Sequence, residues 1–313
     1  MSTRRGIDAF SVQVMVVLCA LWGMQQVAIK LAAHDVAPIL QASLRSGLAA
    51  LLVGLLMTWR GGWEGLRQGT LPAGLLAGVL FSAEFLLIAL SLGYTRAGHV
   101  AVFLYTSPVF SALGLHLLLP SERLRPLQWL GIAVCFTGIA VAFIGGTSPA
   151  QLDARTLLGD ALAVGAGMAW GATTVAVRAS RLSEAPPGLT LFYQLAVAFV
   201  LLLGVAGGTG QTHPVTWTPI AVGSVLFQGA VVSFASYLAW FWLLRRYLAS
   251  NLAVLSFMTP LFGVTLGVLI LDEPLTLNFV LGAVLVLVGI GLVSGEAWLR
   301  RALGRGSSAA PRG

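Results

Sequence analysis

Ten long apolar stretches, separated by short polar links, make up most of the chain. They run over residues 10–31, 38–58, 71–92, 98–119, 126–145, 157–178, 188–207, 217–242, 250–271 and 276–298. A helix needs about 20 mostly apolar residues to cross a bilayer, and each stretch reaches that length. The links are too short to hold a soluble domain. The pattern therefore predicts an all-α membrane protein with ten transmembrane helices.

The composition supports this class of protein. Hydrophobic residues make up 58% of the 313 residues and charged residues 9%, whereas a soluble domain carries about 25% charged residues. The net charge of +7 does not indicate a nucleic-acid partner, because the basic residues are spread over short loops and tails. Cys19 and Cys135 lie inside apolar stretches, which indicates packing rather than a disulfide framework. The partner that the composition predicts is the lipid bilayer.

The basic residues also predict the orientation of the chain. With the N-terminus placed in the cytoplasm, fourteen of the 18 Lys and Arg residues fall on the cytoplasmic side and two on the opposite side. Short cytoplasmic loops carry an excess of positive charge in membrane proteins. We therefore expect a multi-pass protein of a bacterial plasma (inner) membrane with both termini in the cytoplasm. Residues 300–313 are expected to form a disordered cytoplasmic tail.

The second half of the chain repeats the first. Residues 97–110, AGHVAVFLYTSPVF, match residues 249–262, ASNLAVLSFMTPLF, without a gap. Further upstream in each half, Trp22-Gly23 matches Trp170-Gly171. An ordered series of such matches indicates an internal repeat and not a chance likeness.

The repeat predicts the architecture. The two units, residues 1–148 and 149–299, have five helices each. Because five is an odd number, the second unit enters the membrane from the opposite side, so the repeats are inverted. Inverted repeats are typical of secondary transporters that bind a substrate between their halves near the middle of the bilayer.

The repeated motifs resemble the drug/metabolite transporter superfamily, in particular its ten-helix EamA-type members. The likeness is carried by the Trp-Gly pairs, by a proline in the fourth helix of each unit, and by an acidic residue followed by glycines at the end of each unit. Those last residues are Glu122 with Gly131 and Gly138, and Glu273 with Gly282 and Gly289. Within the superfamily the chain looks most like the aromatic amino acid exporter type. This resemblance implies efflux of amino acids and related metabolites.

Charged groups inside a membrane are costly, so they mark candidate sites. Glu84 and Arg45 lie about 12 Å and about 10 Å from the outer ends of their helices, at about 1.5 Å of rise per residue. Their similar depth predicts an Arg45–Glu84 ion pair, which serves either structure or substrate binding. Lys30 and His99 lie at outer helix ends, where they reach either the membrane interface or the cavity. A surplus of cations from Lys30 and Arg45 would hold a substrate carboxylate.

The remaining candidates for substrate binding are aromatic and amide side chains inside the helices. They are Trp22, Gln26, Tyr105, Trp170, Tyr193, Tyr237 and Trp240. Each one alone can equally serve helix packing. Together they predict a mostly apolar pocket with a few polar groups, which is the usual composition of a small-molecule site. Pro108 and Pro260 remove helical hydrogen bonds and predict either static kinks or the hinges of a gate.

Enzyme signatures are missing from the sequence. The single lysine is not part of a GxxxxGK phosphate loop, and the four histidines lack metal-ligand spacing, so we expect no metal and no cofactor. The predicted function is export of amino acids, aromatic ones included, and related small metabolites by alternating access, carried out by a monomer. The alternative is export of other metabolites or of cationic drugs with Glu84 as the ligand. A membrane-embedded enzyme is a remote alternative.

Overall fold

The chain is helical throughout its described part. The computed structural model describes residues 8–64, 66, 69–119, 123–144, 154–247, 252 and 255–307. Its elements are α1 (Ala9–Leu31), α2 (Pro38–Arg60), α3 (Leu71–Leu92), α4 (Ala97–Leu104), α5 (Ser107–Leu118), α6 (Pro126–Ile144), α7 (Ala154–Arg178), the 3₁₀-helix η4 (Arg181–Ser183), α8 (Pro187–Gly208), α9 (Pro219–Leu226), the π-helix η5 (Phe227–Ser236), α10 (Tyr237–Arg246), α12 (Met258–Leu271) and α13 (Leu277–Ser307). The predicted all-helical fold class is confirmed for these residues.

The apolar stretches of the sequence correspond to these helices. Within the described residues, seven helical stretches are long and apolar enough to span a membrane: α1, α2, α3, residues 97–118, α7, α8 and residues 219–240. Shorter apolar helices cover residues 126–142, 258–271 and 277–293. The chain is therefore a multi-pass membrane protein by the length and composition of its helices.

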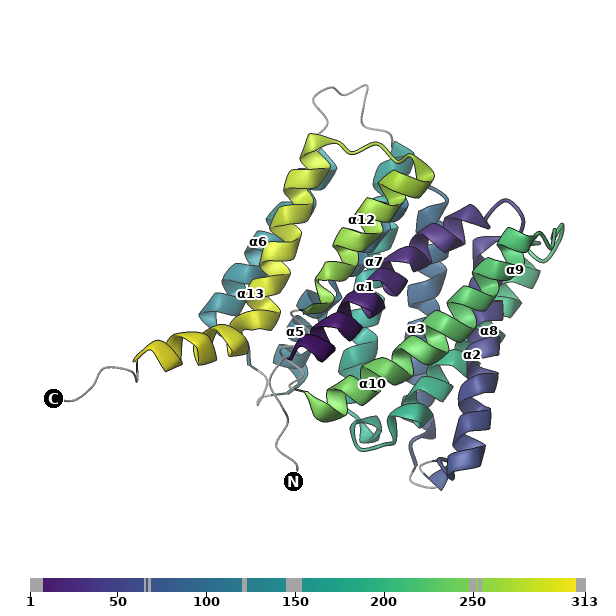
Figure 1. Cartoon of the computed structure of the whole chain (residues 1–313), viewed down its shortest axis with the longest axis horizontal. Helices are drawn as coiled ribbons and strands as arrows, with labels where there is room; N and C mark the ends of the chain where they lie inside the picture. Colours follow the sequence, from purple (N-terminus) through teal and green to yellow (C-terminus); the bar gives the residue numbers. More distant parts are fainter. Residues whose placement is uncertain are drawn as a thin grey trace.

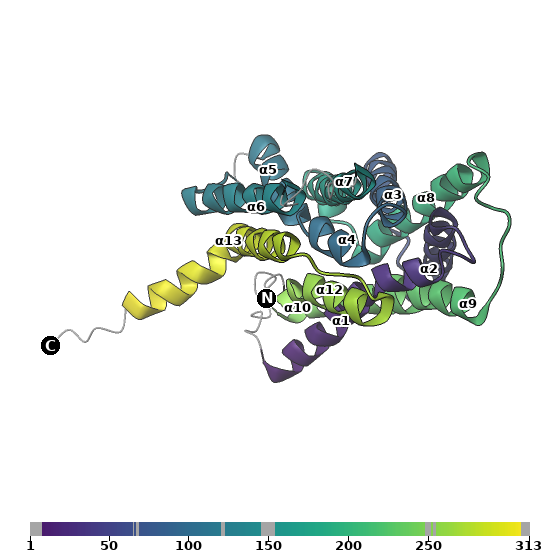
Figure 2. The ribbon, with the colours of Figure 1, turned by 90° about the horizontal axis from the view of Figure 1, so that it is seen from above.

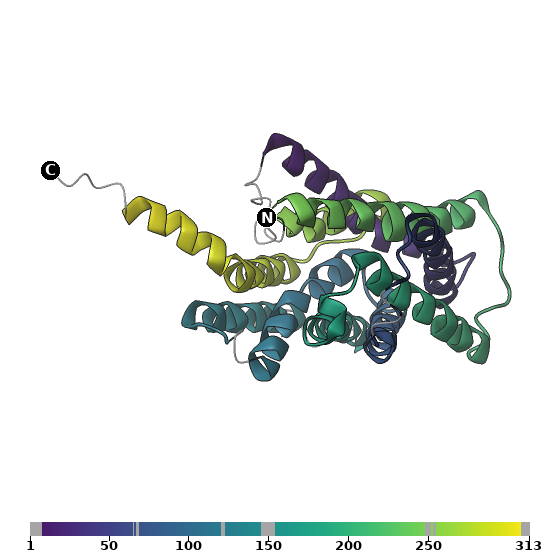
Figure 3. The ribbon, with the colours of Figure 1, turned by 90° about the horizontal axis from the view of Figure 1, so that it is seen from below.

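The helices lie in two rows when the molecule is seen from above or below (Figures 2 and 3). One row contains α6, α7, α3 and α8, and the other contains α12, α10, α1 and α9. Helix α2 packs against α8 and η5 at one end of the rows, and α13 packs along α6 near the other end (Figure 1). Each row combines helices from both halves of the sequence. The halves are therefore interlocked and do not form two separate lobes.

Glycines let helices from the two halves approach closely, and the approach is reciprocal. A Cβ atom on Gly23 of α1 would lie 2.7 Å from the backbone nitrogen of Gly263 in α12. A Cβ atom on Gly171 of α7 would lie 3.0 Å from the backbone nitrogen of Ser111 in α5. Gly171 is the sequence counterpart of Gly23, and Ser111 is that of Gly263. The two contacts are therefore the same contact with the halves exchanged.

Helices α6 and α13 also meet through reciprocal glycine contacts. A Cβ atom on Gly131 would lie 2.8 Å from the carbonyl oxygen of Gly289, and one on Gly289 would lie 2.6 Å from the carbonyl oxygen of Gly131. Gly138 and Gly282 meet in the same way, at 2.7 and 2.6 Å. These backbone contacts leave no room for a larger residue, which explains the repeated glycines.

The fourth helix of each half is broken and not merely kinked. The stretch 98–119 divides into α4 and α5, and Pro108 is the second residue of α5, where a helix needs no N–H donor. In the break, the amides of Tyr105 and Thr106 donate to carbonyls only three residues back, at 3.2 and 3.1 Å. Pro260 is likewise the third residue of α12. Each proline therefore begins a new helix, which corrects the prediction of a proline in mid-helix.

Two further predictions differ from the structure. The stretch 217–242 is not one α-helix, because the π-helix η5 occupies its centre, and such segments are frequent at functional sites. The disordered tail expected from residue 300 is helical up to Ser307 as the end of α13. Residues 296–304, EAWLRRALG, consist mostly of strong helix formers, which favours this continuation. Glu122 and residues 308–313 lie outside the described residues.

Candidate functional site

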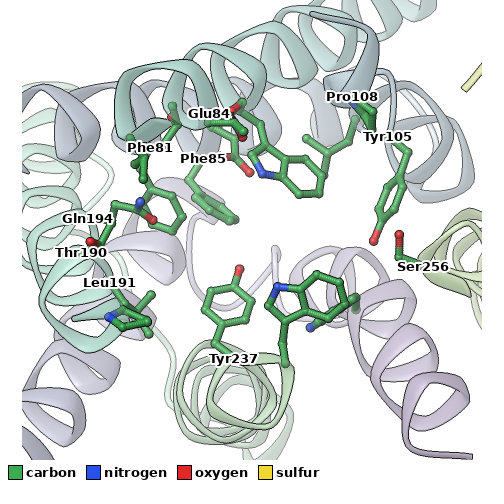
Figure 4. Close-up of a pocket in the computed structure, with 18 of the residues that line it drawn as sticks. Phe81, Glu84, Phe85, Tyr105, Pro108, Thr190, Leu191, Gln194, Tyr237 and Ser256 are labelled. Atoms are coloured by element: carbon green, nitrogen blue, oxygen red, sulfur yellow. Dashed lines mark hydrogen bonds between the residues drawn. The ribbon is translucent and has the colours of Figure 1, made fainter. Parts of the chain in front are cut away.

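A cavity of about 640 Å³ lies between the two rows of helices. Side chains of α1, α3, α7, α8 and α10 and of the α4–α5 break line it. Figure 4 shows Glu84 and Phe85 on one side of the open space and Tyr237 on the opposite side. The cavity extends to the connection between α7 and α8, where Leu182 and Ser183 line it. We call this the open end of the cavity.

Aromatic rings form much of the wall. They belong to Trp22, Phe81, Phe85, Tyr105, Trp170, Tyr237 and Trp240. Pairs of rings hold one another edge to face, with Trp22 and Trp240 5.7 Å apart and Tyr105 and Trp170 5.5 Å apart between centroids. The indole N–H of Trp22 also donates to the hydroxyl of Ser236 at 2.9 Å. Ser236 is the last residue of η5, so the π-helix positions part of the aromatic wall.

Most of the polar lining is uncharged. It consists of Gln25, Gln26, Thr173, Thr174, Ser183, Thr190, Gln194, Ser256 and Thr259. Two charged residues line the cavity in the described part of the chain: Glu84 in the middle of α3 and Arg178 at the last residue of α7, near the open end. The site can therefore bind an apolar or aromatic group and offers a single acidic side chain to a charged one.

Glu84 and Arg45 do not form the predicted ion pair. Glu84 is 5% exposed and makes no hydrogen bond to any described residue. Arg45 is fully buried, and its guanidinium stacks on Phe85, with Cζ 3.6 Å from the ring centroid. The two charges still attract each other electrostatically, but no guanidinium nitrogen lies within 4.0 Å of a carboxylate oxygen of the pair. The guanidinium packs on the ring of Phe85, which lines the cavity, while Arg45 itself does not line it.

Away from the open end, a charged network joins four helix ends. Lys30 at the end of α1 donates to Glu273 and to the carbonyl oxygen of Thr95, both at 2.9 Å. Glu273 also accepts the backbone amides of Ala97 and Gly98 at 2.7 and 3.1 Å, so it caps the start of α4. A carboxylate at the first amides of a helix is favoured by the helix dipole. The contact ties the second half of the chain to the first.

A hydrogen-bonded histidine–aspartate pair extends this network. Asp160 of α7 accepts a hydrogen bond from the Thr95 hydroxyl and pairs with Nδ1 of His99 at 2.9 Å. The imidazole of His99 stacks on Phe279, with 3.9 Å between the ring centroids. Lys30 lies one helical turn beyond the lining residue Gln26, so the network lies across this end of the cavity. We call it the sealed end and define it by Lys30, Thr95, His99, Asp160 and Glu273.

The structure thus divides the residues predicted for binding into two groups. Trp22, Gln26, Glu84, Tyr105, Trp170, Tyr237 and Trp240 line the cavity, as does Pro108. Lys30, Arg45, His99, Tyr193 and Pro260 do not line it. Lys30 and His99 are occupied by carboxylates, and the hydroxyl of Tyr193 shares a hydrogen bond with Thr70 at 3.1 Å. The predicted surplus of cations facing the cavity is therefore absent among the described residues.

Several residues of the cavity wall and of the sealed end were not found from the sequence. Phe81 and Phe85 line the cavity, but α3 is apolar on all sides, so its periodicity marks no cavity face. Asp160 was missed because it lies near the start of its stretch, where an acid is expected to be solvated. Glu273 was noted only as part of the repeat. Its partner Lys30 lies 243 residues away in the sequence, and no local pattern connects the two.

A bundle of apolar helices around an aromatic-lined cavity defines a membrane transport protein of the α-helical type. The sequence matches the EamA-like transporter family over residues 9–144 and 157–295, and the chain belongs to this family. The family recognised from the repeated motifs, within the drug/metabolite transporter superfamily, is thereby confirmed.

Relatives and solved structures agree with this assignment. The chain is 26% identical over 318 residues to a "Probable amino-acid metabolite efflux pump" of Escherichia coli, which covers 98% of this chain and 100% of that protein. It is 27% identical over 248 residues to the "Aromatic amino acid exporter YddG" of Salmonella typhimurium, which covers 76% of this chain and 82% of that protein. A crystal structure with 18% sequence identity covers 93% of this chain and 100% of its own at a TM-score of 0.63, which shows a shared fold.

Proposed function

We propose that the chain is a secondary transporter that exports amino acids, aromatic ones included, and related small metabolites by alternating access. The cavity carries this proposal. It lies inside the bundle, it has the volume and aromatic wall of a small-molecule site, and its described lining reaches the α7–α8 connection at one end of the bundle. The names of the relatives in Escherichia coli and Salmonella typhimurium support amino acids as the substrate class.

We further propose ten membrane crossings in two inverted five-helix repeats, residues 1–148 and 149–299. The reciprocal glycine contacts support this arrangement, because an internal two-fold axis requires each contact to recur with the halves exchanged. Gly131 with Gly289 and Gly138 with Gly282 meet this requirement. In this proposal both termini lie in the cytoplasm of a bacterial cell, the open end faces the cytoplasm, and Pro108 and Pro260 act as hinges. The molecule works as a monomer, because its two halves enclose the cavity between them.

Transport through the cavity can be tested in proteoliposomes. Purified protein is reconstituted with L-phenylalanine inside, and the entry of labelled L-phenylalanine is followed by counterflow. Wild type is expected to show saturable uptake above that of protein-free liposomes. Thr190→Trp places a large ring in the cavity wall and should abolish uptake. Val200→Trp adds the same ring to the same helix at a position that is 63% exposed, so this control should retain uptake.

Two results would contradict the proposed function. One is a folded wild-type protein that transports no amino acid. The other is a Thr190→Trp variant that transports at the rate of the Val200→Trp control, because the substrate would then not pass through this cavity.

A second candidate function, export of cationic metabolites or drugs, is favoured by one observation. Glu84 is the acidic side chain that lines the cavity, and no described residue donates a hydrogen bond to it. Cations without a carboxylate should then be transported in the same counterflow assay.

A further inference from the structure

Glu84 is a buried acidic group whose hydrogen-bonding capacity is unused. Its side chain is 5% exposed, it lines the cavity, and Oε2 has no partner among the described residues. A carboxylate removed from water without donors is strongly disfavoured unless something in the site offsets the loss. In this structure neither a backbone amide nor a side chain of the described residues donates a hydrogen bond to Oε2.

Arg45 supplies a counter-charge but cannot supply the missing hydrogen bond. It stacks on Phe85, is fully buried, and interacts with Glu84 only electrostatically, with no guanidinium nitrogen within 4.0 Å of a carboxylate oxygen. Stacking on an aromatic ring holds a guanidinium in place. Arg45 therefore offsets part of the charge of Glu84 from outside the cavity lining, while Glu84 itself lines the cavity and its Oε2 has no hydrogen-bond partner among the described residues.

The surroundings of Glu84 suit a cation with an apolar body. Phe85 follows it in α3, and Figure 4 shows Tyr237 on the opposite side of the open space. Aromatic faces attract cations within about 6 Å of the ring centre. An ammonium group has three N–H donors and so matches an acceptor-only carboxylate. The neighbouring rings would then pack against the apolar part of the same molecule.

We propose that Glu84 binds the ammonium group of the transported molecule, and that this group is the feature by which the cavity selects its substrates. The inference rests on the proposed function and makes its substrate class more specific. It replaces the expected recognition of a carboxylate by Lys30 and Arg45, which the structure places outside the cavity. A zwitterionic amino acid and a cationic amine share the ammonium group, whereas a deaminated acid lacks it.

Binding of three matched probes tests the proposal. Purified protein in nanodiscs is titrated at neutral pH by calorimetry with L-phenylalanine, phenethylamine and 3-phenylpropionate, which have the same ring. The first carries both charged groups, the second only the ammonium and the third only the carboxylate. Wild type should bind at least one of the two amines at least about tenfold more tightly than 3-phenylpropionate. Comparison of the two amines shows whether the carboxylate contributes to binding.

Variants then assign the preference to Glu84. Glu84→Gln should weaken amine binding about tenfold or more and leave binding of 3-phenylpropionate unchanged within about twofold. Glu84→Asp keeps the charge and should keep the preference for amines. Glu184→Gln removes an exposed acid just after η4, outside the cavity lining, and should bind all three probes as wild type does. Thermal melting identifies any variant that has not folded.

The outcomes separate this inference from the proposed function. Amine binding by folded Glu84→Gln at the wild-type level would overturn the inference and leave transport intact. Equal affinity of wild type for the amines and the deaminated acid would overturn it even if no Glu84 variant folds. Tight amine binding without counterflow would instead contradict the proposed function while the ammonium site stands. A wild-type protein that binds none of the probes contradicts both.

Discussion

Glu273 is the residue whose loss should open the sealed end. Its carboxylate accepts from Lys30 Nζ at 2.9 Å and from the amides of Ala97 and Gly98 at 2.7 and 3.1 Å. Glu273→Gln preserves the shape of the side chain but removes the charge. The new side-chain NH₂ group, itself a donor, also replaces an oxygen that accepts a hydrogen bond from Lys30 or from a backbone amide of α4. The variant therefore weakens the ion pair between α1 and the residues that follow α12.

The size of the effect follows from the exposure of the two partners. Removing one member of a buried, hydrogen-bonded charge pair costs about 3–5 kcal/mol. Glu273 is buried, but the side chain of Lys30 is 29% exposed, and solvent screening reduces the loss. We therefore expect about 2–3 kcal/mol. At about 1.4 kcal/mol for each factor of ten, the population with an open sealed end should rise about 30- to 150-fold.

Cysteine labelling measures this population. Gln26 lines the cavity one helical turn below Lys30, so a Gln26→Cys reporter lies just inside the sealed end. The native Cys19 and Cys135, both buried, are replaced by alanine in the background. A membrane-impermeant maleimide is applied from the face that bears the α3–α4 connection. Labelling should be slow in the reporter protein and faster by the factor given above after Glu273→Gln.

A charge-matched control completes the experiment. Glu64→Gln removes an exposed acid from the α2–α3 connection and should leave the labelling rate unchanged. If Glu273→Gln melts like the reporter protein and is labelled at the same rate, the network does not close this end. The assignment of Glu273 as part of the closure would then be refuted.

Two further predictions concern packing. Gly138→Ala would place a Cβ atom 2.6 Å from the backbone nitrogen of Val286, so α6 and α13 must separate, at a cost of about 1–3 kcal/mol in stability. Thermal melting should show this loss. The control Gly207→Ala, whose Cβ atom would meet nothing within 4 Å, should melt like wild type. Trp22→Phe removes the hydrogen bond to Ser236 and should cost about 1 kcal/mol. Ser236→Ala removes the same hydrogen bond. The double variant should therefore lose less stability in thermal melting than the sum of the losses of the two single variants. Strictly additive losses would contradict a direct hydrogen bond between Trp22 and Ser236.

Much of the fold could be predicted because it depends on one-dimensional properties of the chain. In a bilayer, backbone groups must bond within their own helix, so apolar stretches of about 20 residues mark the helices directly. The repeated motifs were equally informative. Gly23 and Gly171 recur in the sequence, and each meets the other half of the chain at backbone distance. The breaks near Pro108 and Pro260 were located, although their form was not.

The cavity was predictable in composition but not in its electrostatics. Trp22, Tyr105 and Tyr237 could be found because each combines an aromatic ring with a polar N–H or O–H group inside an apolar stretch, whereas Phe81 and Phe85 carry no polar group. Arg45 was misplaced for a physical reason. Depth along a helix follows from residue count, but the direction in which a side chain points depends on how that helix is rotated against its neighbours. Here that rotation places the guanidinium on the ring of Phe85 and leaves Arg45 outside the cavity lining.

The sequence by itself thus determined that this chain is a helical membrane protein made of two related halves, since hydrophobicity and repetition are properties of residue order. Only the tertiary structure decided which charges are paired. Lys30 is paired with Glu273 and His99 with Asp160, whereas Oε2 of Glu84, a residue that lines the cavity, has no hydrogen-bond partner among the described residues. Such pairings require residues from distant helices to meet within about 4 Å. Helix crossing and rotation control that meeting, and neither is encoded in the local pattern of any single stretch.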